Sequence, residues 1–293
     1  MPLGSFSPHS PQTQAIAVLF GGILIVCGTI FLVVAGLVGY GLLGKTRSSW
    51  AQSLRPGRIE TVWTATALAI VTAIFIASVR AMALIDAPKE DASGRTPDLA
   101  ITGHQWWWDA RYPNGAVAVS EIHIPAGRRL LARIGSADVI HDFWVPQLAR
   151  KMDAVPGRSG YIWLEADAPG TYQGVCSEFC GAQHARMHLL VIAESEAEYA
   201  AWLRRQAEPA RTPPPALYER RCAGCHTDPA KGPDLTHVAG RRTLGAALSE
   251  NTPANLALWI AKPQSVKPGN RMPDQRLSND EVGALAGYLG SLQ

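Results

Sequence analysis

The sequence predicts a multidomain membrane protein made of a two-helix transmembrane hairpin, an all-β domain with Greek-key connections and a small all-α domain. Three observations predict this fold class: two uncharged runs near the N-terminus, a central region of short apolar stretches cut by turn motifs, and a Pro-rich segment followed by helical patterns. The expected parts are an N-terminal segment (1–14), the hairpin (15–85), the β domain (86–200), a linker (201–215) and the C-terminal domain (216–293).

The composition supports a membrane contribution. Of the 293 residues, 47% are hydrophobic and 17% are charged, which excludes a disordered chain. The low charge is concentrated at one end, because residues 1–44 contain no Asp, Glu, Lys or Arg. A net charge of +3 without a basic stripe argues against nucleic acid as a partner.

The hairpin is predicted from length and charge. Residues 15–43 are uncharged and would reach ~44 Å as a helix, beyond the ~30 Å hydrocarbon core. Residues 61–79 form a second uncharged run. Lys45, Arg47, Arg55 and Arg58 lie between the runs against Glu60 alone, so the short loop is expected in the cytoplasm. The expected protein crosses the inner (plasma) membrane twice, with its N-terminus and its C-terminal domains on the periplasmic side.

The β domain is predicted from its turns. Pro and Gly punctuate residues 101–192 at 113–115, 125–127, 156–157 and 169–170, a spacing typical of an antiparallel sandwich or barrel. Residues 104–108 are expected to alternate along one strand, with Trp106 and Trp108 on one face and Trp107 on the other.

Metal-ligand chemistry is concentrated in residues 176–187. Cys176, Cys180, His184 and Met187 place two thiols, an imidazole and a thioether in one loop, a soft donor set that favours copper. A tetrahedral zinc site is the alternative, although Met is a poor zinc ligand, and a disulfide between the two cysteines is the structural alternative. His141, at the end of an apolar strand, lies 35 residues before Cys176.

Together these residues resemble the copper A domain of cytochrome c oxidase subunit 2, whose pattern is a strand His followed by C-S-E-x-C-G-x-x-H-x-x-M. The resemblance implies a cupredoxin fold that holds a dinuclear copper A centre, two copper ions bridged by Cys176 and Cys180. It implies that His141 and Met187 complete one copper, and that His184 and the backbone carbonyl of Glu178 complete the other.

Further residues match the same family. The family's G-H-Q-W stretch is matched at 103–106, which implies that Trp106 is the electron entry contact. The family also implies that the Glu178 side chain reaches a magnesium ion at the boundary with subunit 1. Glu60 opens an E-T-V-W-T stretch that resembles the entrance of a proton pathway, and residues 151–158 resemble the segment that docks on subunit 1.

The C-terminal domain carries a second redox motif. Cys222, Cys225 and His226 form the C-x-x-C-H pattern of one covalent c-type haem, with His226 as an iron ligand. A thioredoxin-like pair is the alternative, but it needs a βαβ context, whereas residues 217–221 and 279–292 read as helices around a loop-rich middle. Met272, between prolines and 46 residues after His226, is the expected sixth ligand. This stretch resembles a class I cytochrome c.

The combined resemblance is to subunit 2 of caa-type oxidases, in which a cytochrome c domain is fused to the copper domain. It implies an electron-input subunit of a proton-pumping terminal oxidase. Electrons would pass from haem c to copper A and then to haem a of subunit 1, which also holds the haem-copper site that reduces oxygen to water. Expected partners are subunits 1 and 3, membrane lipid, and a cytochrome or quinol-oxidising complex as donor. The alternatives are the electron-input subunit of a copper A nitric oxide reductase and a freestanding membrane electron carrier.

Overall fold

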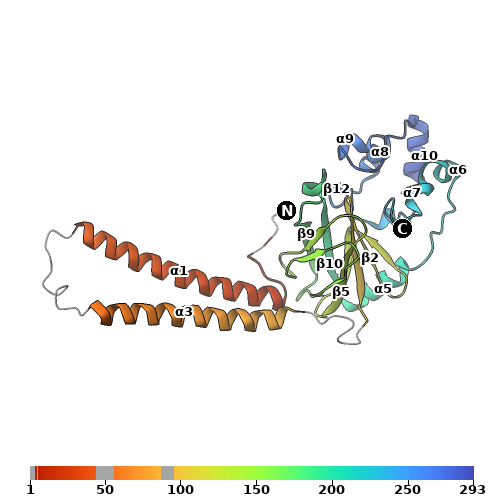
Figure 1. The fold of residues 1–293 in the computed structure, drawn as a ribbon. Helices are drawn as coiled ribbons and strands as arrows, with labels where there is room; N and C mark the ends of the chain where they lie inside the picture. The colour runs from red at the N-terminus through yellow and green to blue at the C-terminus, as the bar shows by residue number, and fades with distance from the viewer. Residues whose placement is uncertain (1–3, 5, 44–55, 87–95) are drawn as a thin grey trace. The chain divides into compact units, whose positions relative to one another are not determined.

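The computed structural model describes residue 4 and residues 6–43, 56–86 and 96–293. The chain divides into two compact units, one of residues 14–86 and the other of residues 1–13 with 87–293. Figure 1 shows the helices of the first unit and the strands and short helices of the second.

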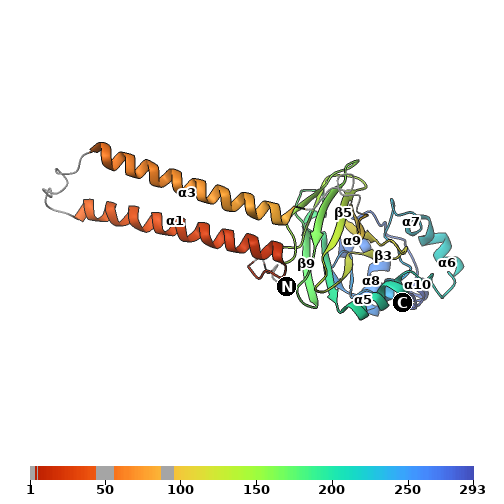
Figure 2. The same cartoon turned by 90° about the horizontal axis from the view of Figure 1, so that it is seen from below.

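The hairpin unit consists of two long helices, α1 (Pro11–Leu43) and α3 (Pro56–Ile85). Figures 1 and 2 show them running antiparallel to one another. Both are long and apolar enough to cross a membrane, with mean hydropathies of 2.8 and 2.3 over their most apolar stretches. Apolar side chains such as Phe31 and Phe75 are exposed on them, as expected of helices whose solvent is lipid. Lys45, Arg47 and Arg55, on which the predicted orientation depends, lie outside the described residues.

The β domain contains two five-stranded sheets. One has the strand order β3, β2, β1, β5, β8 and the other β4, β10, β9, β6, β7. The strands are β1 (Leu99–His104), β2 (Trp107–Arg111), β3 (Val117–Val119), β4 (Glu121–Pro125), β5 (Leu130–Ser136), β6 (His141–Trp144), β7 (Met152–Ala154), β8 (Gly160–Leu164), β9 (Gly170–Cys176) and β10 (His188–Glu194).

The predicted turns occur between strands, and Gly115, Gly127 and Gly157 adopt positive φ angles of 90°, 72° and 73° there. The sheets are mixed rather than wholly antiparallel, because β1 pairs in parallel with β5 and β4 in parallel with β10. These parallel pairs join strands that are not consecutive, as chain crossings between the sheets of a sandwich require.

The expected alternation through residues 104–108 is wrong. β1 ends at His104 and β2 begins at Trp107, and these two residues are antiparallel partners. Gln105 and Trp106 therefore form the turn between the strands and are free to reach toward other loops. Trp108 is fully buried and packs its ring edge on Phe143, with the ring centroids 5.5 Å apart.

A helix follows the last strand of the β domain. α5 (Glu196–Gln206) begins with a capping box in which the Ser195 hydroxyl accepts from the Glu198 amide and the Glu198 carboxylate accepts from Ser195. The helix continues to Gln206, so residues 201–206 of the expected linker are helical. Trp202 stacks on His123, with ring centroids 4.1 Å apart.

The C-terminal domain is built from short helices around its own apolar core. Its helical elements are α6 (Ala216–Tyr218), η2 (Glu219–Ala223), α7 (Gly224–His226), η3 (Val238–Gly240), α8 (Pro253–Ala261), α9 (Pro263–Val266) and α10 (Asn279–Leu289), and a small ribbon pairs β11 (Thr243–Leu244) with β12 (Ser249–Glu250). α8 and α10 contribute the buried residues Leu256, Ile260, Leu285 and Leu289. The sequence predicts a helix up to residue 292, but α10 ends at Leu289 and Gly290 is its C-cap residue.

Candidate functional site

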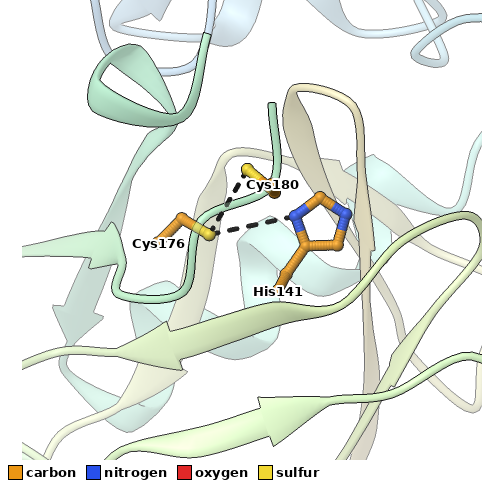
Figure 3. Close-up of side chains that lie close together, drawn as sticks. All are labelled: His141, Cys176 and Cys180. Atoms are coloured by element: carbon orange, nitrogen blue, oxygen red, sulfur yellow. Dashed lines mark hydrogen bonds between the residues drawn. The ribbon is translucent and has the colours of Figure 1, made fainter. Parts of the chain in front are cut away.

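Two neighbouring strands present the first site residues. His141 begins β6 and Cys176 ends β9, and the two strands are antiparallel with Phe143 opposite Cys176. Figure 3 shows the imidazole of His141 and the thiols of Cys176 and Cys180 pointing toward one another. His141 is fully buried, and its Nδ1 lies 3.8 Å from Sγ of Cys176.

The remaining candidate ligands come from the loop that follows β9. Sγ of Cys180 lies 3.7 Å from Sγ of Cys176, 3.7 Å from Nδ1 of His184 and 3.8 Å from Sδ of Met187. The backbone carbonyl of Glu178 lies 3.3 Å from Sγ of Cys176. The turn η1 (His184–Arg186) folds the loop back, and the amide of Met187 donates to the carbonyl of His184. The structure thus brings together all six predicted copper-ligating groups.

The donor set fits copper. Both cysteines are free thiols, and their sulfur atoms are much farther apart than the ~2.05 Å of a disulfide. At 3.7 Å they are close enough for both to bond the same ion at the usual metal–sulfur distance of ~2.3 Å. Two thiolates, two imidazoles and a buried thioether are soft ligands, so the site favours copper over zinc.

Electrostatics favour one thiolate before any metal binds. The hydrogen bond from the Cys180 thiol lowers the pKa of the Cys176 thiol, against the opposing effect of burial. The same shared proton raises the pKa of Cys180. Metal binding needs deprotonated cysteines, and the lowered pKa of Cys176 favours that form for one of the two.

Other residues hold the ligands in place. Oδ1 of Asp138 lies 2.8 Å from Nε2 of His141 and fixes the ring so that Nδ1 faces the sulfur atoms. The carbonyl of Cys180 accepts from the Gln105 side chain at 2.8 Å and from the indole N–H of Trp106 at 3.0 Å. Sequence reasoning missed Asp138 and Gln105. Asp138 could have been found from its position three residues before His141. Gln105 could not, because its contact depends on the turn at residues 105–106.

The second set of predicted residues lines a cavity in the C-terminal domain. Cys222, Cys225, His226 and Met272 all line it, together with apolar side chains of α8 and α10. Nδ1 of His226 donates to the carbonyl of Pro233 at 2.8 Å, which leaves Nε2 as the ligand atom. Hydrogen bonds hold the backbone of Met272 in place. The Met272 amide donates to the Asn270 side chain, and the Met272 carbonyl accepts from the Gln264 side chain. Two thiols, an imidazole and a thioether around an apolar cavity fit a c-type haem.

The β domain contributes to the same cavity. Trp106 and Trp107 line it from that domain, and Lys267 and Arg271 line it from the C-terminal domain. Trp106 therefore lines the cavity and also donates its indole N–H to the Cys180 carbonyl. The expected electron entry residue lies between the two candidate redox sites.

The two other predicted carboxylates lie elsewhere. Glu178 is exposed beside the cysteines, with Phe179 exposed next to it. Glu60 is exposed near the start of α3, in the hairpin unit.

The β domain and the C-terminal domain each resemble a known family. Residues 116–194 match the family model for the periplasmic domain of cytochrome c oxidase subunit II, and residues 215–293 match that of cytochrome c. Cytochrome c oxidase subunit 2 of Alkalihalophilus pseudofirmus is 33% identical over 99% of this chain and 91% of its own length. The subunit 2 of Bacillus sp. strain PS3 is 28% identical over 80% of this chain and 74% of its own length.

Among solved structures, the periplasmic domain of subunit II of cytochrome oxidase from Bradyrhizobium japonicum is 30% identical, covering 38% of this chain and 95% of that one, with a TM-score of 0.36.

The fold and the site define an electron-transport protein with two apolar helices, a cupredoxin-type domain and a cytochrome c domain. The chain belongs to the cytochrome c oxidase subunit 2 family. It is a component of a haem–copper oxidase and assembles with other oxidase subunits. The two matched domains imply copper A and haem c, and the apolar helices fit a membrane protein with periplasmic domains.

Proposed function

We propose that this chain relays electrons from its own haem c to copper A and on to haem a of subunit 1, where oxygen is reduced to water. The observation that carries this proposal is the position of Trp106, which lines the haem cavity and donates to the carbonyl of the copper-site residue Cys180. In this proposal oxygen is reduced in subunit 1, and none of the described residues of this chain reacts with oxygen.

The copper site would be held by His141, Cys176, Cys180, His184, Met187 and the Glu178 carbonyl. When bound, a dinuclear copper centre held by these residues would accept one electron and pass it on. The residues of this chain support that role by rigidity. His141 and Met187 are fully buried, and the hydrogen bonds to Asp138 and to the Cys180 carbonyl restrain the ligands.

The haem would be attached through Cys222 and Cys225 and ligated by His226 and Met272. Burial lowers the pKa of His226, which keeps its imidazole neutral and able to bind iron. The exposed Cys225 and half-buried Cys222 are both accessible to the haem vinyl groups at the cavity wall.

Two carboxylates would serve the partner subunit. The exposed Glu178 side chain is available for a magnesium ion shared with subunit 1, and Glu60 for the entrance of a proton pathway. Residues 151–158 would dock on subunit 1, subunit 3 would complete the assembly, and a cytochrome or quinol-oxidising complex would supply electrons. The β domain and C-terminal domain would lie on the periplasmic side of the inner membrane.

Purification of the native complex tests this function. We expect this chain to hold two coppers and one iron, in addition to the metals of a co-purifying multi-span haem subunit, and we expect oxygen consumption rather than nitric oxide consumption. Nitric oxide reduction would identify the electron-input subunit of a nitric oxide reductase instead. A chain that purifies alone with its metals would be a freestanding carrier.

A further inference from the structure

The C-terminal domain contacts the β domain through buried charged groups, beginning with Glu121. This residue starts β4 in the β domain and is 4% exposed. Its Oε2 accepts from the Arg242 amide at 2.9 Å, and its Oε1 accepts from the Thr243 amide at 2.6 Å and from the Thr243 hydroxyl. Every described hydrogen bond to this carboxylate therefore comes from the C-terminal domain.

Lys267 makes the reciprocal contact. It is 3% exposed, and its ammonium donates at 3.0 Å to the carbonyl of Trp106 in the β domain and at 3.0 Å to that of Gly245 in its own domain. One cation thus joins the turn at residues 105–106 to Gly245, which directly follows β11.

Burial of these charges ties them to one arrangement of the domains. A charged group removed from water without partners costs several kcal/mol, so each side chain is stable in its buried position only while the other domain supplies its hydrogen bonds. A shifted or rotated dock would leave a buried carboxylate and a buried ammonium without partners. Two such contacts at separate points fix both position and orientation.

More polar contacts join the same two faces. The Gln183 amide donates to the Pro268 carbonyl, and the Arg242 guanidinium donates to the Thr171 hydroxyl at 2.8 Å. Nη1 of Arg271 lies 3.8 Å from Oδ2 of Asp138, the residue that orients His141. The interface therefore reaches the copper site itself.

We propose that Glu121 and Lys267 are positioning residues that lock the C-terminal domain onto the β domain, holding the haem cavity against Trp106. This inference rests on the proposed relay. The transfer it serves moves one electron from haem to the copper centre and forms or breaks no bond. The lock makes the tethered domain a fixed donor rather than one that must find its dock at each turnover, and it leaves the faces turned away from Trp106 for the external donor.

The test uses the full chain in the assembled oxidase, with Glu121→Gln, Lys267→Met and the milder Thr243→Val, which removes only the hydroxyl contact. Glu196→Gln and Lys262→Met are matched controls, since both residues are exposed. Unchanged haem bands and near-infrared copper absorption show that each variant is folded and loaded. Amide hydrogen exchange at residues 242 and 243 reports docking, and the rate of copper reduction after flash reduction of the haem reports transfer.

We expect faster exchange at these amides and a transfer rate reduced by about tenfold or more in Glu121→Gln and Lys267→Met, because electron transfer depends on the fixed geometry. A smaller effect is expected for Thr243→Val, and none for the controls. Exchange and transfer that match the wild type in both charge variants would overturn the lock, as would faster exchange with an unchanged rate. If the wild type itself shows no haem-to-copper transfer, the proposed relay is wrong, which is a different result.

Discussion

Nε2 of His141 lies 2.8 Å from Oδ1 of Asp138, while Nδ1 of the same ring lies 3.8 Å from Sγ of Cys176. The carboxylate accepts a hydrogen bond from Nε2–H, so in the neutral ring the nitrogen that faces the sulfur atoms keeps its lone pair for a metal. One hydrogen bond thus selects the tautomer that the copper site needs.

Replacement of Asp138 by Asn should weaken copper binding. The amide can donate to Nε2 and so favour the wrong tautomer, and loss of such an orienting carboxylate typically costs about 10–100-fold in metal affinity. Copper titration of the metal-free protein, followed by its near-infrared absorption, measures the effect. Asp167→Asn is the control, because Asp167 makes a similar pair with His9 at 3.0 Å on the surface. Equal affinities for the two variants would contradict the role of Asp138.

Gly103→Ala should disturb the same imidazole from the other side. A Cβ atom at this position in β1 would lie 2.9 Å from Cδ2 of His141 and 3.1 Å from the Trp108 ring. Both neighbours are buried, so the expected cost is about 1–3 kcal/mol in the free energy of unfolding, with weaker copper binding. Denaturant titration and copper titration measure the two effects.

Gly135→Ala is the matched control for this change. Gly135 lies in β5, paired with β1, and a Cβ there would meet only a backbone oxygen at 3.9 Å. If the two alanine variants are equally stable and bind copper equally, close packing on His141 does not explain the glycine.

Cys176→Ser should separate the two redox centres. Loss of one bridging thiolate should abolish the near-infrared copper absorption, while the haem bands persist because Cys222, Cys225 and His226 lie in another domain. Absorption spectra and metal analysis of the purified complex measure this. Cys27→Ser, in α1, should leave both sets of bands unchanged. Retention of the copper bands in Cys176→Ser would rule out the bridging role.

Most of the candidate ligands can be identified from the sequence because they are close together in it. Cys176, Cys180, His184 and Met187 fall within one loop, and Cys222, Cys225 and His226 within one turn, so their spacing alone brings them together. His141 and Met272 could be paired with them through family resemblance. The fold class and its order of elements also follow from periodicity, charge and turn residues.

The residues that the sequence does not reveal act over long separations. Gln105 reaches Cys180 only because a turn replaces the expected strand at residues 105–106. Glu121 and Thr243 are 122 positions apart, and Lys267 and Trp106 are 161 apart. Contacts of this kind depend on how two domains pack, which no local pattern of residues records.

Lys267 gives a stability profile of its own at alkaline pH. Burial, followed by the nearby Arg186 guanidinium, lowers the pKa of its ammonium to about 8, while Cys180 opposes the shift and His188 also faces it. Between pH 8 and the ordinary value of 10.5 the unfolded chain keeps a proton that the folded chain has lost. The free energy of unfolding should therefore rise with pH in this window, with a contribution from Lys267 of up to about 1.4 kcal/mol per pH unit. The neutral amine still has two N–H groups for the carbonyls of Trp106 and Gly245, so docking persists. We expect denaturant titrations of the full chain at several pH values, followed by haem absorbance, to show a smaller rise of the free energy of unfolding with pH for Lys267→Met than for the wild type or Lys262→Met. Equal rises in all three proteins would mean that Lys267 is not held in a buried position that favours loss of its proton.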